Sequence, residues 1–165
     1  MKKSGFTFIE VILYVGLVSI LVLSAVIFGW DAIYTSSKSQ TQQKLSNSLR
    51  FASSRIELEI RAASAINSVT PTSVSLASLD AARNPTVIDL SSGRVRIGWG
   101  SSAPCPATNP CNLTPQDVNA TLSFENLSHG NSNNIKFTIG GELTGDRSEF
   151  KASQTLTSAS EVRAE

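Results

Sequence analysis

The sequence predicts an α+β protein in which a long N-terminal helix packs, by its second half, on an antiparallel β-sheet. Three observations support this prediction: an apolar segment near the N-terminus, a polar segment after it with helical periodicity, and a series of short alternating stretches in the remainder. The chain has 165 residues, a length typical of one domain. One modest core is therefore expected.

The apolar segment, residues 11–30, contains no charged residue. A helix of about 20 residues is about 30 Å long, which matches the hydrocarbon thickness of a bilayer. The segment is longer than the apolar region of a cleaved secretory signal, and no A-x-A-like cleavage site follows it. Lys2 and Lys3 precede it, and Trp30 and Tyr34 lie at its far end. These flanks predict a single span with the N-terminus in the cytoplasm and an interfacial aromatic belt outside.

Glu10 interrupts what is otherwise an uncharged stretch from Phe6 to Trp30. A charge at the centre of a bilayer costs about 2.5–3.5 kcal/mol, and less near the interface. Glu10 is therefore expected to have a partner. In the alternative interpretation, Glu10 lies at the headgroup level of a plain membrane anchor and has no role.

The N-terminal residues have a more specific pattern. Lys2 and Lys3 are followed by Gly5, then by Phe6, a threonine, two apolar residues and Glu10. Over residues 2 to about 30 this pattern resembles the leader and first helix of type IV pilins and type II secretion pseudopilins. The resemblance implies a leader at residues 1–5 and a transmembrane and assembly helix at residues 6–34.

The resemblance also implies partners and modifications at this end of the chain. A prepilin peptidase would cleave between Gly5 and Phe6 and methylate the new amine of Phe6. Glu10 would then pair with that amine on a neighbouring, axially shifted helix, because attraction between opposite charges is stronger where the dielectric constant is low. The further partners implied are other pilin or pseudopilin subunits, the inner-membrane assembly platform and, before assembly, membrane lipid.

Residues 35–66 show the spacing of an amphipathic helix that continues from the apolar segment. The apolar positions recur every three or four residues: Leu45, Leu49, Ala52, Ile56, Ile60, Ala63 and Ile66. A coiled coil is an alternative for this stripe. The alternating stretches that follow favour packing against a sheet instead.

Six short stretches in the head segment, residues 67–165, are predicted strands separated by turn-forming residues. They are residues 73–79, 86–90, 94–99, 119–127, 134–143 and 149–157. The second and third stretches form the clearest predicted hairpin, and the fourth and fifth form another. An antiparallel sheet with one apolar face would cover the helix stripe, as the pilin resemblance also implies.

Two features indicate a subtype within the resemblance. Residues 55–66 resemble the helix end of larger minor pilins and J-type pseudopilins, where a charged pair precedes an alanine-rich exit. The apolar segment also lacks the proline that major pilins often have near its middle. A minor subunit is therefore expected.

Cys105 and Cys111 enclose a short loop that contains two prolines. Outside the cytoplasm, a pair this close is expected to form a structural disulfide. A short loop gains only about 2–3 kcal/mol from such closure. The loop can equally act as a surface contact element.

Charge and composition exclude several classes of function. The 14 basic and 13 acidic residues give a net charge of +1, so no nucleic-acid partner is predicted. One histidine and two cysteines supply no recognisable zinc site or catalytic constellation, so neither an enzyme nor a cofactor is expected. Glu142, Asp146 and Glu149 are weak candidates for calcium ligands, although a solvated turn explains them as well.

The sequence thus predicts a structural subunit, expected to be minor, of a type IV pilus or a type II secretion pseudopilus. Its location would be the cytoplasmic membrane, then a cell-surface or periplasmic filament. The alternative is a single-span, membrane-anchored extracytoplasmic binding or adhesion module that does not polymerise.

Overall fold

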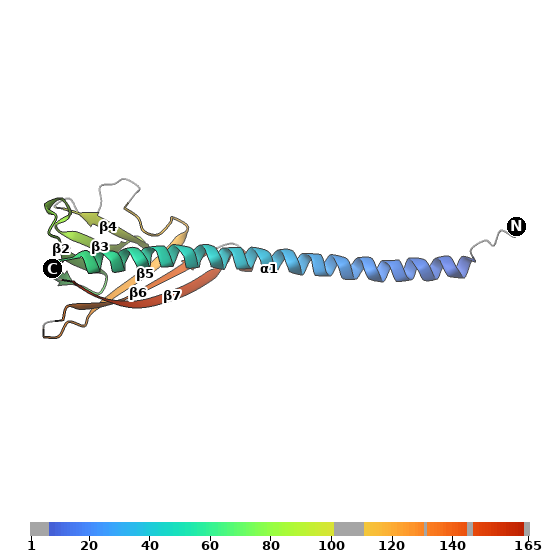
Figure 1. Cartoon of the computed structure of the whole chain (residues 1–165). Coiled ribbons are helices and arrows are strands. Elements are labelled where there is room, and N and C mark those ends of the chain that lie inside the picture. The colour runs from blue at the N-terminus through green and yellow to red at the C-terminus, as the bar shows by residue number, and fades with distance from the viewer. Residues whose placement is uncertain (1–6, 101–110, 131, 145–146, 164–165) are drawn as a thin grey trace. The chain divides into compact units, whose positions relative to one another are not determined.

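The computed structural model describes residues 7–100, 111–130, 132–144 and 147–163. The chain divides into two compact units, Met1–Ser37 and Lys38–Glu165, and the second unit is called the head below. One helix, α1 (Phe8–Ala62), is followed by strands and two short 3₁₀ helices (Figure 1). These are β1 (Ala65–Val69), β2 (Ser73–Ala77), η1 (Ala81–Arg83), β3 (Thr86–Ser91), β4 (Arg94–Trp99), β5 (Val118–Asn126), β6 (Asn134–Leu143), η2 (Ser148–Phe150) and β7 (Ala152–Glu161). The predicted α+β class with a long N-terminal helix is confirmed.

The apolar stripe of the head portion of α1 is the centre of the core. Five of its residues are at most 1% exposed: Leu45, Leu49, Ala52, Ile56 and Ile60. The inward side chains of the strands cover them, among them Val74, Ile88, Ile97, Leu122 and Phe137. Strands therefore cover the predicted helix stripe, as the sheet interpretation requires and the coiled-coil alternative does not.

The predicted single sheet is wrong in one respect, because the strands form two antiparallel sheets. Their strand orders are β1-β2-β3-β4 and β5-β6-β7. The outer edge of β4 is already occupied, since the Ile97 amide donates to the Cys111 carbonyl and the Leu113 amide donates to the Val95 carbonyl, at 2.9 and 2.8 Å. β5 therefore cannot extend the first sheet at that edge.

Two backbone hydrogen bonds nevertheless tie β5 to the turns of the first sheet. The Ala120 amide donates to the Gly93 carbonyl at 2.7 Å, and the Phe124 amide donates to the Pro71 carbonyl at 2.9 Å. The two sheets thus enclose one continuous core beside the helix.

Both predicted hairpins are confirmed. In the first, β3 pairs with β4 from Ser91↔Arg94 to Thr86↔Trp99. Ser92 and Gly93 form its turn with φ angles of 51° and 68°, the left-handed conformation that two-residue hairpin turns require. In the second, β5 pairs with β6 along Val118–Asn126.

The predicted end of the helix, residue 66, is wrong by four residues because α1 ends at Ala62. The Ala63 amide donates to the Ile60 carbonyl at 3.3 Å, and the Ser64 amide donates to the Ala77 carbonyl at 2.9 Å. Ala65–Val69 then pairs with β2. Strand pairing thus overrides a helical spacing that continues through Ala63 and Ile66 in the sequence.

The last strand is also displaced from its prediction, residues 149–157. Ser148–Phe150 forms η2, and β7 runs from Ala152 to Glu161. Pairing with the whole of β6, from Leu143↔Ala152 to Asn134↔Glu161, sets these limits.

Candidate functional site

The N-terminal unit consists, over its described residues, of the first part of α1 with its apolar side chains exposed. Nineteen large apolar residues from Phe8 to Tyr34 are at least 42% exposed, and Phe8, Ile20, Phe28 and Trp30 are at least 70% exposed. Nothing in the described chain covers this surface. Large exposed apolar surfaces mark contacts with lipid or with other proteins.

This part of α1 also satisfies its own polar groups. The Ser19 hydroxyl donates to the Val15 carbonyl at 2.7 Å, and the Ser24 hydroxyl donates to the Leu21 carbonyl at 2.8 Å. Such local bonding is what a hydroxyl needs where no water is present. Among the described residues, α1 is the one helix long and apolar enough to span a membrane, which is consistent with a single-pass membrane protein.

Glu10 lies in the first turn of α1. Its amide donates to the Thr7 carbonyl at 3.0 Å and to the Thr7 hydroxyl at 3.4 Å. Thr7 is therefore the N-cap of the helix. A carboxylate in the first turn is also favoured by the helix dipole.

This capping role was not predicted above, although the sequence contains a signal for it. Thr7 and Glu10 have the T-x-x-E spacing of a capping box. In the structure Glu10 contributes to this cap through its backbone amide, so the cap is compatible with pairing of its carboxylate to a neighbouring chain.

The predicted cleavage and methylation residues, Gly5 and Phe6, lie outside the described residues. So does Cys105, and the disulfide with Cys111 therefore stays a prediction. Cys111 itself is half-buried beside β4, held there by the hydrogen bond from the Ile97 amide.

The three weak calcium candidates are not brought together in the part of the chain that the structure describes. Glu142 lies exposed on β6, Asp146 is outside the described residues, and the side chain of Glu149 is outside them too. Among the described residues, no cluster of histidine, cysteine, aspartate or glutamate forms a metal-ligand set. Trp30 and Tyr34, the predicted aromatic belt, are both exposed.

The head contains a charged cluster that was not predicted from the sequence. Glu59, which is buried on α1, forms ion pairs at one oxygen, Oε1, with Arg55 Nη2 at 2.7 Å and with Arg83 Nη2 at 2.8 Å, and Arg83 also donates a hydrogen bond to it. Both guanidinium groups lie over the ring of Trp99, at 6.0 and 5.0 Å from its centroid. The Arg55–Glu59 spacing is visible in the sequence, but the contributions of Arg83 and Trp99 arise only from folding.

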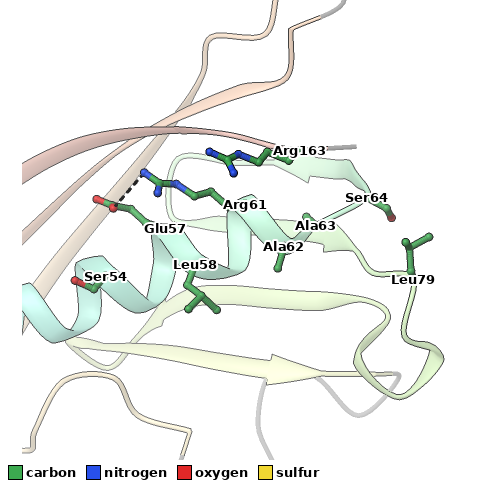
Figure 2. Close-up of a pocket in the computed structure, with 9 residues that line it drawn as sticks. All are labelled: Ser54, Glu57, Leu58, Arg61, Ala62, Ala63, Ser64, Leu79 and Arg163. Atoms are coloured by element: carbon green, nitrogen blue, oxygen red, sulfur yellow. Dashed lines mark ion pairs between the residues drawn. The ribbon is translucent and has the colours of Figure 1, made fainter. Parts of the chain in front are cut away.

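A shallow hollow of ≈ 590 Å³ surrounds the C-terminal end of α1 (Figure 2). Arg61 forms an ion pair with Glu57 at 3.8 Å, and its Nε donates to the Ser160 hydroxyl at 3.3 Å. Glu57 accepts a hydrogen bond from Ser158 at 2.5 Å. These contacts attach the last turns of the helix to β7.

The rest of the hollow has mixed chemistry. Leu58 and Leu79 are 51% and 81% exposed, and Arg163, from the end of the chain, is exposed as well. In Figure 2, the side chains of Arg61 and Leu58 leave the helix in different directions. The hollow is therefore an open surface with an apolar part and a cationic part.

Comparison with known proteins gives no identification. No protein-family model, curated protein or solved structure matches the chain.

Proposed function

We propose that this protein is a structural subunit, of the minor type, of a type IV pilus or a type II secretion pseudopilus. The observation that carries the proposal is the exposed apolar surface of α1, which begins with a single carboxylate, Glu10. The leader-like residues Lys2, Lys3, Gly5 and Phe6 precede it in the sequence. An apolar helix with this start is suited to lipid before assembly and to the helices of other subunits afterwards.

The change of surroundings from lipid to protein costs little free energy. Lipid tails are about as apolar as leucine side chains, so helices in a membrane associate through packing and hydrogen bonds and gain little from the hydrophobic effect. The apolar side chains of α1 can therefore leave the bilayer when equivalent helices replace the lipid. This supports a role for α1 in assembly.

Glu10 supplies the electrostatic part of the proposal. Cleavage after Gly5 leaves a positive amine on Phe6, and that amine and Glu10 are both costly in an apolar environment. Pairing the two across neighbouring helices removes both costs and sets the axial shift between subunits. Prepilin peptidase, other subunits and the inner-membrane assembly platform are the partners that this role requires.

Blocking the leader cut tests the proposed function. In a host with a pilus or type II secretion system, Gly5→Asn should keep the full-length chain in the membrane fraction and remove it from sheared filaments. Ser4→Ala is the matched control beside the cleaved bond and should behave as wild type. Filaments that contain uncleaved Gly5→Asn chains would contradict the proposal.

A non-polymerising, membrane-anchored binding module is the second candidate. The hollow at the end of α1 favours it, because exposed Leu58 and Leu79 together with Arg61 and Arg163 suit an acidic ligand with an apolar part. The N-terminus discriminates between the candidates. A mature chain that still begins at Met1 or Lys2 would support the binding module.

A further inference from the structure

Two isolated charges lie beyond the apolar segment of α1. Asp31 is the one acidic residue between Glu10 and Glu57, and Lys38 is the one basic residue between Lys3 and Lys44. Both side chains are exposed. They carry opposite charges seven residues apart in a helix that is continuous through both.

Neither charge has a partner in its own chain among the residues that the structure describes. In a helix, side chains interact with those three or four residues away. For Asp31 these positions hold Ile27, Phe28, Tyr34 and Thr35, and for Lys38 they hold Tyr34, Thr35, Thr41 and Gln42. None of them is charged. The described residues form six ion pairs, and Asp31 and Lys38 belong to none of them.

We propose that Asp31 of one copy forms an ion pair with Lys38 of a neighbouring copy, as a second device that sets the axial register. This inference rests on the proposed function. When Glu10 of one copy faces the Phe6 amine of the next, the two helices are shifted by four residues, or about 6 Å. The copy that contributes the Phe6 amine is displaced toward the C-terminal end of its neighbour and is called the outer copy; the copy that contributes Glu10 is called the inner copy. The same shift places Asp31 of the outer copy level with Thr35 of the inner copy.

From that level, Lys38 is three residues away, or about 4.5 Å along the axis. The flexible four-carbon stem of lysine covers this distance. With no shift the axial gap is about 10 Å. The shift that pairs Glu10 therefore also brings Asp31 and Lys38 closer along the axis, with Lys38 and Glu10 on the inner copy and Asp31 and the Phe6 amine on the outer copy.

Cysteine cross-linking tests the proposed contact in assembled filaments. The double variant Asp31→Cys with Lys38→Cys should give a ladder of disulfide-linked oligomers after mild oxidation. Within one helix these two positions lie about 10 Å apart, too far for a disulfide. Each single variant, which retains the native cysteines, should give no ladder.

A second double variant tests whether cross-linking depends on the axial register of the two copies. Asp31→Cys with Gln42→Cys uses the position one turn beyond Lys38, where the axial gap between copies is about 10 Å, and should give little cross-linking. A ladder as strong in this control, or no ladder from the Asp31/Lys38 pair, would overturn the inference.

Charge exchange tests whether the contact is an ion pair. Asp31→Lys and Lys38→Asp should each reduce incorporation into filaments roughly two- to fivefold, the range for a partly exposed ion pair, with normal leader cleavage. The exchange variant carrying both changes should recover incorporation. Singles that match wild type, or an exchange variant without recovery, would overturn the pair. A wild-type chain absent from filaments would instead count against the proposed function.

Discussion

At the scale of single residues, Glu10 combines two effects that can be separated. Its backbone and its place in the first turn support the start of α1 through Thr7, while its charge is free to act on a neighbouring chain. Glutamine keeps the size of the side chain and its acceptor oxygen but removes the charge. The two effects therefore predict different outcomes for different substitutions.

Glu10→Gln should abolish or strongly reduce incorporation into filaments and leave leader cleavage unchanged. The Phe6 amine would then have no opposite charge in an apolar environment, a cost of roughly 2–3 kcal/mol. Immunoblots of sheared filaments and of membranes measure the two outcomes. Thr7→Ala is the control for capping, because it weakens the helix start by about 1 kcal/mol and retains the charge. Normal incorporation of Glu10→Gln would contradict the pairing role.

Lys44 and Asp117 form a surface ion pair between α1 and the start of β5. The hydrogen bond from Lys44 lowers the pKa of the Asp117 carboxyl below its ordinary value of 3.8. A carboxyl whose pKa is lower in the folded state stabilises the fold at pH values above its unfolded pKa. That contribution is lost as the pH falls through the folded pKa.

Asp117→Asn should therefore destabilise the head at pH 7 and have no effect at a pH well below 3.8. Solvent screens the pair, since the two side chains are 60% and 47% exposed, so the loss at pH 7 should stay within about 1 kcal/mol. Denaturant unfolding of both proteins at several pH values measures the difference. A difference that grows as the solution is acidified would contradict this account.

At the scale of elements, the packing of α1 on the sheets depends on a close approach at Gly141 of β6. A Cβ atom there would lie 3.0 Å from Leu49 Cδ2, 3.0 Å from Val118 Cγ1 and 3.1 Å from Leu45 Cδ1. These contacts are too short for the side chains to remain in place. Glycine at this position therefore lets the helix approach the strand.

Gly141→Ala should lower the free energy of unfolding by about 1–3 kcal/mol through overpacking. Denaturant unfolding of the full chain in detergent measures it. Ser123→Ala on the exposed face of β5 is the matched control and should change stability by less than about 0.5 kcal/mol. Equal stabilities of the two variants would show that the helix can move away from the strand at no cost.

The cluster around Glu59 holds η1 and the end of β4 against α1. Glu59→Gln should destabilise the head by about 1–3 kcal/mol, because the two arginines lose their buried carboxylate acceptor while remaining partly solvated. Glu142→Gln, which changes an exposed carboxylate on β6, should be close to neutral. Thermal unfolding followed by circular dichroism compares them. An effect no larger than that of Glu142→Gln would contradict a stabilising role for the cluster.

The sequence predicted elements more completely than their limits and partners. Short-range signals, such as the turn at Ser92 and Gly93, identified both hairpins with their correct strands. The strand Ala65–Val69 was missed because no glycine or proline ends the helical spacing before it. This segment is a strand because it pairs with β2. A local sequence pattern does not reveal that pairing. The division into two sheets likewise depends on residues 111–113 occupying the edge of β4.

The same distinction applies to the candidate site. Glu10 and the apolar surface of α1 were predictable because a charge and a run of apolar residues are local features. The Glu59 cluster was not, since Arg83 and Trp99 reach it from distant parts of the chain. The cleavage residues and Cys105 remain predictions from sequence.

At the scale of the whole molecule, the two units have separate requirements. Every buried apolar core residue of the described chain belongs to the head, from Leu45 onward. The first unit contributes exposed apolar surface and no described core residue. Stability is therefore expected to reside in the head, and association in the first part of α1.

A fragment of residues 38–165 should fold as a soluble monomer with the unfolding midpoint of the full chain in detergent. Circular dichroism and sedimentation measure both properties. An unfolded fragment would show that the apolar segment stabilises the head, against the division of roles described here.

The most direct test of the central claim is the intact mass of this chain recovered from sheared filaments. If the chain is an assembled pilin-type subunit, it should be present there without residues 1–5 and with one methyl group on the amine of Phe6. The same spectrum should show no chain that begins at Met1. A chain found only in the membrane fraction, with its first five residues attached, would contradict the claim.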